Sequence, residues 1–406
     1  MRKIVYLLEQ PFDERNYDRF GIITWIDRGW EVEVWDMTPL LHPIVWQMFT
    51  EKGKKINQFN GYYVVAEKKQ LKQRYSDIPV SKIEYFVDYA GNSYYSLLIK
   101  MRLLKAGSKM IKSANAGSIP LAADFIKISI WNKLSHKLQS AYSIGTVKLI
   151  KLLVHKFIVK LIQDKIQPSL VVVSGEKSIR SNHAIDKQEI IKAHNFDYDI
   201  YLKFVELPVS VESCYGVFVD QDLCFHPDYQ YSNVEALVTP TRYYSSLCKG
   251  LRRISTALLT QMKIAGHPRA CNDENALNYF EGLPVINGST MELISQAQFV
   301  VGHYSTALQI AVLFKKPLIF LTTDELKKSI VGPQIEIMAT MLGKQAINLD
   351  AELDHLEWEK ELVVDVKKYG TYRQEYIKTD GSPELSSWDI VIDHIERTTD
   401  IPFVQF

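Results

Sequence analysis

Short, uninterrupted apolar runs alternate along the chain with longer segments that carry apolar residues at helical spacing. In the first half the apolar runs predict strands over 3–8, 31–35, 62–66, 83–87 and 169–174, and the segment 15–28 predicts a helix after the first of them. The run SLVVVS at 169–174 is apolar almost throughout, which is typical of parallel strands covered on both faces. The alternation therefore predicts a parallel α/β sheet.

The second half repeats this alternation. Strands are predicted over 215–220, 262–265, 284–286, 299–301, a run ending at Thr322, and 345–349; helices are predicted over 241–261, 275–280, 289–297, the apolar segment after Thr306, and 386–397. Residues 93–166 are predicted to be mostly helical, and ELPVSVES at 206–213 is typical of a crossing between domains. We therefore expect an N-terminal domain over 1–207, a C-terminal domain over 208–385, and a tail over 386–406 whose helix can pack back on the N-terminal domain.

The composition agrees with two globular domains and argues against a nucleic-acid-binding protein and against a membrane-spanning one. The chain has 406 residues, of which 47% are hydrophobic and 23% charged, so it is long enough for two cores. Its net charge of +1 provides no field that would attract nucleic acid. No apolar run approaches the roughly 18 residues of a membrane span. The first apolar run ends at Glu9, as expected for a strand rather than a signal peptide, so we expect a cytoplasmic protein.

Charge is distributed unevenly along the chain. Residues 96–166 hold thirteen Lys and Arg but only two acids, a local net charge of +11. Within this region 146–167 predicts a helix with one apolar face and several lysines around the rest, and the run 100–112 repeats the pattern. Such a surface is either the solvated side of a core-facing helix or a contact with anionic lipid headgroups of the inner membrane. Both interpretations stay open.

Two turns at predicted strand ends carry chemistry suited to phosphate, and a third is a candidate for holding the cytosine or ribose of a nucleotide. The strand at 299–301 leads into Tyr304-Ser305-Thr306 before an apolar helix, so hydroxyls and free helix N–H groups meet there. The strand at 262–265 ends in Gly266-His267-Pro268-Arg269, and Asn287-Gly288-Ser289-Thr290 opens a further helix. We expect the first two turns to be adjoining corners that share one phosphate. Helix capping and a buried strand-end histidine are the structural alternatives.

Carboxylates follow two other predicted strands. Asp220-Gln221-Asp222 ends the strand at 215–220, and alternation along an extended chain would place both aspartates on one face. Its structural alternative is an Asx-type turn. Glu176 ends the last N-terminal strand and is expected to face the same cleft from the opposite side, unless it is a solvated loop carboxylate. A second His-Pro pair, His226-Pro227-Asp228, falls in a predicted loop.

An acidic motif, an HP motif and a serine motif occur here in that order, as Asp220-Gln221-Asp222, His267-Pro268 and Ser305-Thr306. Over about residues 215–325 the chain therefore resembles the nucleotide-binding half of GT-B glycosyltransferases that use CMP-activated sugars. These include bacterial sialyltransferases, polysialyltransferases and retaining β-Kdo transferases of surface-polysaccharide assembly. Over the N-terminal half the resemblance rests on domain order. It implies a GT-B architecture, in which two Rossmann-like domains face a central cleft.

The resemblance also implies roles for individual residues. Asp220, with Asp222 as second choice, is either the nucleophile of a retaining transfer or the base of an inverting one. Glu176 is a further candidate for the acceptor's base, and His267 for stabilising the departing CMP. The donor-binding set comprises His267, Pro268, Arg269, Asn287, Gly288, Thr290, Tyr304, Ser305 and Thr306. A metal is not expected, since a CMP-sugar has a single phosphate and the four cysteines lack metal-ligand spacing.

These residues favour a glycosyltransferase that moves Kdo, or a related ulosonic acid, from its CMP form to a surface-polysaccharide or lipid-linked acceptor. Kdo is preferred because Leu223 follows the acidic motif, where the sialyltransferase version has Gly. The alternatives are an inverting CMP-sialic acid transferase, a CDP-alcohol phosphotransferase of the teichoic-acid type, and a non-catalytic nucleotide-sugar-binding subunit. The expected partners are the CMP-sugar, the glycan acceptor and anionic lipids at 96–166, without nucleic acid and without a cofactor.

Overall fold

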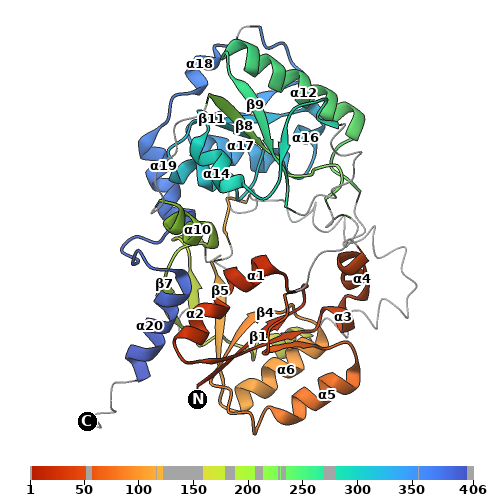
Figure 1. The fold of residues 1–406 in the computed structure, drawn as a ribbon, viewed down its shortest axis with the longest axis vertical. Helices are drawn as coiled ribbons and strands as arrows, with labels where there is room; N and C mark the ends of the chain where they lie inside the picture. The colour runs from red at the N-terminus through yellow and green to blue at the C-terminus, as the bar shows by residue number, and fades with distance from the viewer. Residues whose placement is uncertain are drawn as a thin grey trace.

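The computed structural model describes residues 2–51, 57–115, 117–121, 159–178, 188–205, 214–226, 229, 235–268, 279–354 and 356–399. Two α/β domains are stacked along the long axis of the molecule (Figure 1). Each is built on its own sheet, and all strand pairings within both sheets are parallel. The predicted fold class, two Rossmann-like domains in a GT-B arrangement, is confirmed.

The N-terminal sheet has the order β3-β2-β1-β4-β5-β6-β7. Its strands are β1 (Lys3–Leu8), β2 (Glu31–Asp36), β3 (Tyr62–Val64), β4 (Tyr85–Tyr89), β5 (Lys109–Ala114), β6 (Leu170–Val173) and β7 (Glu189–Lys192). The helices among them are α1 (Glu14–Arg19), α2 (Ile22–Asp27), α3 (Thr38–Leu41), α4 (Pro43–Glu51), α5 (Lys68–Asp77) and α6 (Tyr94–Lys105). The order places β1 in the sheet interior, between β2 and β4, and its residues beyond Lys3 are buried.

The C-terminal sheet has the order β10-β9-β8-β11-β12-β13. Its strands are β8 (Tyr215–Val219), β9 (Gln261–Ala265), β10 (Val285–Ile286), β11 (Phe299–Gly302), β12 (Leu318–Thr322) and β13 (Ile347–Asn348). Its helices are α12 (Pro240–Ala257), α14 (Thr290–Gln296), α15 (Leu308–Leu313), α16 (Asp324–Lys328), α17 (Gly332–Met341), α18 (Trp358–Glu361) and α19 (Val366–Tyr372). β8 and β11 lie at the centre and are buried at every position, which explains their unbroken apolar sequences.

One prediction for the N-terminal domain is wrong in detail. The helix expected over 15–28 is split into α1 and α2, because the backbone at Gly21 is left-handed (φ +59°). The segment 93–166, predicted to be mostly helical, contains α6 but also the strand β5, and much of it lies outside the described residues. Moreover, Lys100 on α6 is buried and forms an ion pair with Asp88 at 2.8 Å, so it cannot face a lipid surface. The remaining basic helix, expected over 146–167, lies mostly outside the described residues.

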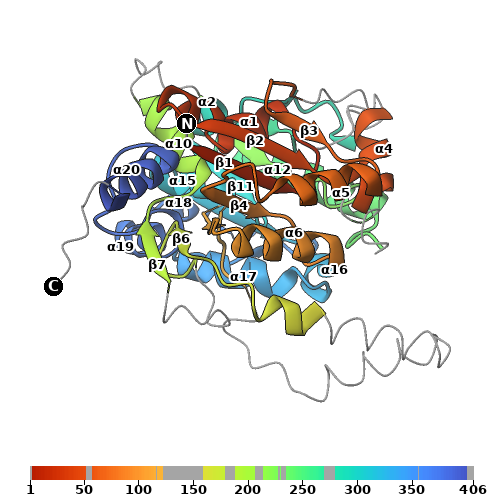
Figure 2. The same ribbon diagram turned by 90° about the horizontal axis from the view of Figure 1, so that it is seen from below.

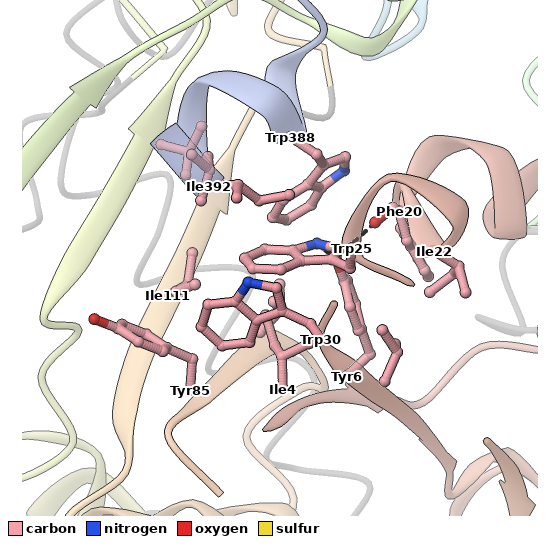
Figure 3. Packing of buried hydrophobic residues seen from close by; sticks show 14 of the residues in the cluster. Ile4, Tyr6, Phe20, Ile22, Trp25, Trp30, Tyr85, Ile111, Trp388 and Ile392 are labelled. Carbon is pink, nitrogen blue, oxygen red and sulfur yellow. Dashed lines mark hydrogen bonds between the residues drawn. The ribbon is translucent and has the colours of Figure 1, made fainter. Parts of the chain in front are cut away.

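The last helix within the described residues, α20 (Ser387–Thr399), packs on the N-terminal domain. Trp388 inserts beside Trp25, with ring centroids 5.9 Å apart (Figure 3). Its indole N–H donates to the Arg19 carbonyl at 2.7 Å. A side chain at Gly21 would lie 2.5 Å from the Trp388 ring, so glycine is required there for space as well as for conformation. The helix predicted over 386–397 thus completes the N-terminal core, and Figure 2 shows it beside β7.

The chain passes between the domains twice, and the two passages lie side by side. The first follows β7 into α10 (Phe196–Val205), and the second runs through the π-helix η1 (Arg373–Ile377) toward α20. Asn195 N–H donates to the Ile377 carbonyl at 2.9 Å, and Thr379 N–H donates to the Ala193 carbonyl at 3.1 Å. The crossing expected at 206–213 lies outside the described residues.

None of the helices in the described ranges is long and apolar enough to cross a membrane.

Candidate functional site

Four strands of the C-terminal sheet end next to one another and place the predicted turns on one edge. Because the strands are parallel, the turns after β10, β9, β8 and β11 follow in that spatial order. They carry Asn287, His267, Asp220 and Ser305, respectively. The sheet therefore gathers the three motifs, which are far apart in the sequence, at its carboxyl edge.

The spatial order corrects one expectation about this edge. The turns with His267 and Ser305 are not adjoining corners, because β8 lies between β9 and β11. Neighbouring strands are about 4.8 Å apart, so these two corners are separated by roughly 10 Å at the backbone. Asp220, at the end of β8, consequently lies in the middle of the site, with the HP turn on one side and the serine turn on the other.

Asp220 is a buried carboxylate held by backbone donors. Its residue is 6% exposed, and its Oδ1 accepts the Asp222 N–H at 3.0 Å. Burial raises the pKa of Asp220 to about 6, while hydrogen bonds from the backbone N–H groups of Asp222, Gln221 and His267 oppose the rise. The His267 contact joins the acidic motif directly to the HP turn. A carboxyl group with this pKa changes its charge close to neutral pH.

Asp222 does not continue the strand, so the expected alternation is wrong. Its backbone is left-handed (φ +50°), and its N–H turns back onto the Asp220 carboxylate. The observed geometry is the Asx-type turn, the structural alternative for this motif. Asp222 is nevertheless buried next to Asp220 and remains within the site.

His267 and Pro268 project from the end of β9. The His267 ring is half-buried and lies 4.9 Å, centroid to centroid, from the ring of His226. The second His-Pro pair of the sequence therefore contributes a histidine to the same place. The separation of His226 and His267 along the chain does not predict this contact. The two rings meet because β8 pairs with β9 in the sheet. Arg269 lies outside the described residues.

The Asn287-Gly288 turn lies against the HP turn. A Cβ atom at Gly266 would fall well inside van der Waals contact of Asn287 Oδ1, so the absence of a side chain at 266 lets Asn287 pack across it. Gly266 N–H also donates to the Ile286 carbonyl at 2.9 Å. Asn287 and Gly288 are exposed, and Thr290 is half-buried at the start of α14. Ser289, the N-cap residue, makes no side-chain capping bond.

Contrary to the prediction from the sequence, Ser305 and Thr306 do not form the N-terminus of a helix. The helix α15 begins only at Leu308 and has six residues, so Ser305 and Thr306 lie in the turn before it. Ser305 Oγ accepts the Ala307 N–H at 3.2 Å. Tyr304 N–H donates to Gln221 Oε1 at 2.8 Å, which ties this turn to the acidic motif. The hydroxyls are present at the site. The dipole of this short helix, however, stabilises a bound phosphate less than the dipole of a longer helix would.

His303, next to this turn, is structural. It is buried, its Nδ1 donates to the Leu321 carbonyl at 2.7 Å, and its Nε2 accepts from the Tyr243 hydroxyl at 2.9 Å. These partners fix the neutral tautomer. Burial lowers the pKa of His303 to about 4, so the ring carries no charge near neutral pH.

Glu176 lies just after β6, at the carboxyl edge of the N-terminal sheet, and contacts the second passage between the domains. Its side chain is exposed and accepts a hydrogen bond from Gln374 Nε2 at 2.7 Å, and its N–H donates to the Gln374 carbonyl. Lys177 pairs with Glu375 at 2.8 Å. The structure thus engages Glu176 with η1, and its expected place opposite Asp220 stays a prediction.

The loop after β5 brings the N-terminal domain onto the serine turn. Tyr304 Oη donates to the Pro120 carbonyl at 2.6 Å, and Gln309 Nε2 donates to the Ser118 carbonyl at 2.5 Å. A side chain at Gly117 (φ +113°) would touch Thr306. The carboxyl edges of the two sheets therefore face each other across the site.

No protein-family model matches the chain, and no curated protein sequence matches it. Solved structures resemble it along nearly its whole length. They include Staphylococcus aureus MnaA with UDP (11% identity, 100% of this chain and 99% of that one, TM-score 0.52). The wall teichoic acid polymerase TagF matches with 12% identity over 99% of this chain and 90% of its own, at a TM-score of 0.53. A putative UDP-N-acetylglucosamine 2-epimerase from Listeria monocytogenes matches with 10% identity, 98% and 97% coverage, and a TM-score of 0.51. At these identities the likeness shows a shared two-domain fold.

Proposed function

We propose that this protein is a glycosyltransferase that transfers Kdo, or a related ulosonic acid, from its CMP-activated form to a surface-polysaccharide or lipid-linked glycan. The observation that carries the proposal is the position of Asp220. A buried carboxyl group with a pKa of about 6 lies between a histidine turn and a serine turn, at a sheet edge that faces the other domain. Ligands of open α/β sheets bind at this edge.

The donor's phosphate is held, in this proposal, above the Asp220 turn. Ser305 and Thr306 offer hydroxyl donors from one side, and the His267 ring reaches toward the same phosphate from the other. A single phosphate needs few donors, and these side chains meet that need without a chelating metal. His267 stabilises the charge that develops on CMP as it departs.

Asp220 acts on the sugar in one of two ways. In a retaining transfer its carboxylate bonds to the anomeric carbon while the bond from that carbon to the phosphate oxygen breaks, and the electron pair leaves with CMP. In an inverting transfer it takes the proton of the acceptor hydroxyl instead. Both require the ionised carboxylate, which predominates above its pKa. Kdo remains the preferred sugar for the retaining route and sialic acid for the inverting one.

A CDP-alcohol phosphotransferase is the second candidate, and the likeness to a wall teichoic acid polymerase supports it. That chemistry breaks a bond to phosphorus, so His267 would matter more than Asp220. The presence of UDP in the MnaA structure supports nucleotide binding by this fold. The likeness to a putative UDP-N-acetylglucosamine 2-epimerase makes UDP-N-acetylglucosamine a necessary comparison. Lipid contact through residues 96–166 also stays part of the proposal.

The test is incubation of the full chain with CMP-Kdo, CMP-sialic acid, CDP-glycerol or UDP-N-acetylglucosamine, followed by measurement of the released nucleotide. We expect CMP release from CMP-Kdo, its loss in Asp220→Asn, and its retention in Glu336→Gln, which changes an exposed carboxylate on α17. Mass spectrometry of the protein with CMP-Kdo then shows whether a sugar adduct forms. CMP release from neither CMP-sugar contradicts the proposed donor. Binding of CMP without turnover identifies a non-catalytic subunit.

A further inference from the structure

A polar cluster occupies the carboxyl edge of the N-terminal sheet, opposite the donor turns. Glu9 is the first residue after β1, and the neighbouring strand β4 leads into the turn that carries Gly91 and Ser93. β5 is next in the sheet, and the loop after it contacts Tyr304 and Thr306. This edge therefore faces the C-terminal domain, as the positions of α1 and α4 in Figure 1 also show.

Glu9 and His42 form a carboxylate–imidazole pair within this cluster. Glu9 Oε2 lies 3.1 Å from His42 Nε2, although the residues belong to the end of β1 and the end of α3. Ser93 Oγ donates to Glu9 Oε1 at 3.2 Å, and Ser96 Oγ donates to the same oxygen. The Glu9 side chain is 10% exposed and that of His42 is 44% exposed. The carboxylate is thus covered, whereas the imidazole is open to a ligand.

The turn that holds Glu9 is itself fixed by a buried cation. Lys100 Nζ donates to the carbonyls of Ala90 and Gly91 at 3.0 Å each and pairs with Asp88 at 2.8 Å. A Cβ atom at Gly91 would lie 2.9 Å from Glu9 Oε2, so the missing side chain leaves room for the carboxylate. The cluster is therefore a built and supported arrangement rather than a chance surface contact.

The pair has the chemistry of an oriented base. An ionised carboxylate only accepts hydrogen bonds, so His42 donates through Nε2, and the lone pair of the neutral ring lies on Nδ1. Nδ1 is then free to accept a proton from a bound ligand, while the contact with Glu9 holds the ring in this orientation. We propose that His42 is the catalytic base that activates the acceptor hydroxyl and that Glu9 is its positioning residue. This inference rests on the proposed function.

In the proposed step the acceptor hydroxyl reacts at the anomeric carbon of the donor sugar. The acceptor hydroxyl gives its proton to Nδ1 of His42, and its oxygen forms a bond to the anomeric carbon of the donor sugar. The bond from that carbon to its leaving oxygen breaks at the same time, and the electron pair stays on that oxygen. This step belongs to the retaining route, in which Asp220 is the nucleophile. The leaving oxygen is therefore that of the Asp220 carboxylate that carries the sugar. His42 thereby takes the role first considered for Glu176, which is bonded to Gln374.

The test uses the full chain with CMP-Kdo, with and without a glycan acceptor. We expect His42→Ala to lower kcat for transfer about 100-fold, with donor affinity in calorimetry within twofold of the wild type. Free imidazole should restore part of the lost rate, because the exposed ring leaves an open space when removed. Glu9→Gln, which keeps the shape but removes the charge, should lower kcat about tenfold without imidazole rescue.

The matched control is His394→Ala. His394 also pairs with a glutamate, Glu189, at 2.8 Å, but Glu189 begins β7 and so lies at the opposite, amino-terminal edge of the sheet. We expect it to keep wild-type transfer. Transfer by His42→Ala within threefold of the wild type, or a loss of folding without imidazole rescue, overturns this inference alone. A wild-type chain that binds CMP-Kdo in calorimetry but transfers nothing overturns the proposed function and this assignment with it.

Discussion

The side-chain amides of Asn195 and Gln309 are joined by a 2.7 Å hydrogen bond in the interior of the protein. Asn195 belongs to the first passage between the domains, and Gln309 belongs to α15, directly after the serine turn. The Gln309 amide also donates to the Ser118 carbonyl, on the N-terminal loop. One fully buried side chain therefore connects the serine turn to the N-terminal domain at two points.

Replacement of this amide should loosen the contact between the domains. Gln309→Leu keeps the volume but leaves the buried Asn195 amide and Ser118 carbonyl without their partner, at about 1–3 kcal/mol each. We expect a fall of roughly 2–5 kcal/mol in the free energy of unfolding, measured by urea denaturation. Gln73→Leu, on the exposed face of α5, is the control and should change stability by less than about 0.5 kcal/mol. Equal stability of the two variants would contradict the role of Gln309.

Asp220 should impose a pH dependence on both activity and stability. Its pKa of about 6 is above the ordinary aspartate value, so the folded state holds the proton more tightly than the unfolded chain does. Its contribution to stability is therefore greatest below about pH 4 and is lost as the pH rises through 6. Nucleotide release should instead fall as the pH drops below about 6, because the carboxylate is then neutral.

The variant Asp220→Asn separates these two effects. At pH 7 it should be more stable than the wild type by about 2–3 kcal/mol, and this advantage should disappear at pH 4. Its transfer activity should be abolished at every pH, with CMP affinity nearly unchanged. Thermal unfolding at the two pH values and a rate assay provide the measurements. A stability difference that does not vary with pH would show that burial does not perturb this group.

Ser305 should contribute to donor affinity. Loss of one charge-assisted hydrogen bond to phosphate costs about 1.5–3 kcal/mol, so Ser305→Ala should weaken CMP binding at least tenfold in calorimetry. Ser295→Ala is a matched control, because this exposed hydroxyl on α14 donates within its own helix, to the Glu292 carbonyl at 2.8 Å. Similar affinities for the two variants would place the phosphate elsewhere on the sheet edge.

The contact between Gly266 and Asn287 can be tested by substituting the two residues singly and together. Gly266→Ala introduces a methyl group against Asn287 Oδ1, so the HP turn or the Asn287 turn must shift. We expect weaker CMP binding in this variant and recovery of most of the affinity in the double variant with Asn287→Ala. Additive effects of the two substitutions, measured as a double-mutant cycle, would contradict the proposed packing.

The apolar runs predicted most strands of this fold because central parallel strands are buried on both faces and cannot carry polar residues. The strand β5 escaped prediction because Lys109 and Lys112 interrupt its apolar pattern within a basic region. The motifs were predicted at the correct strand ends. Their spatial order was not, because it depends on which strands pair, and this places Asp220 between His267 and Ser305.

The dependence on strand pairing also explains why some site residues were not predicted from the sequence. Glu9 and His42 meet only because β1 and α3 end at one edge, and nothing in their separation along the chain indicates a contact. The one local signal was a carboxylate directly after the first buried strand. Asp222 was misplaced because a non-glycine residue with a left-handed backbone breaks the alternation on which the prediction depended.

Trp388 has a consequence for biosynthesis. The residues that pack against Trp25 belong to α20, which follows both domains in the sequence, so the core of the N-terminal domain stays incomplete until α20 has been synthesised. Nascent chains that lack α20 should therefore expose an aromatic surface, and a truncation ahead of α20 should leave a product that needs chaperone protection.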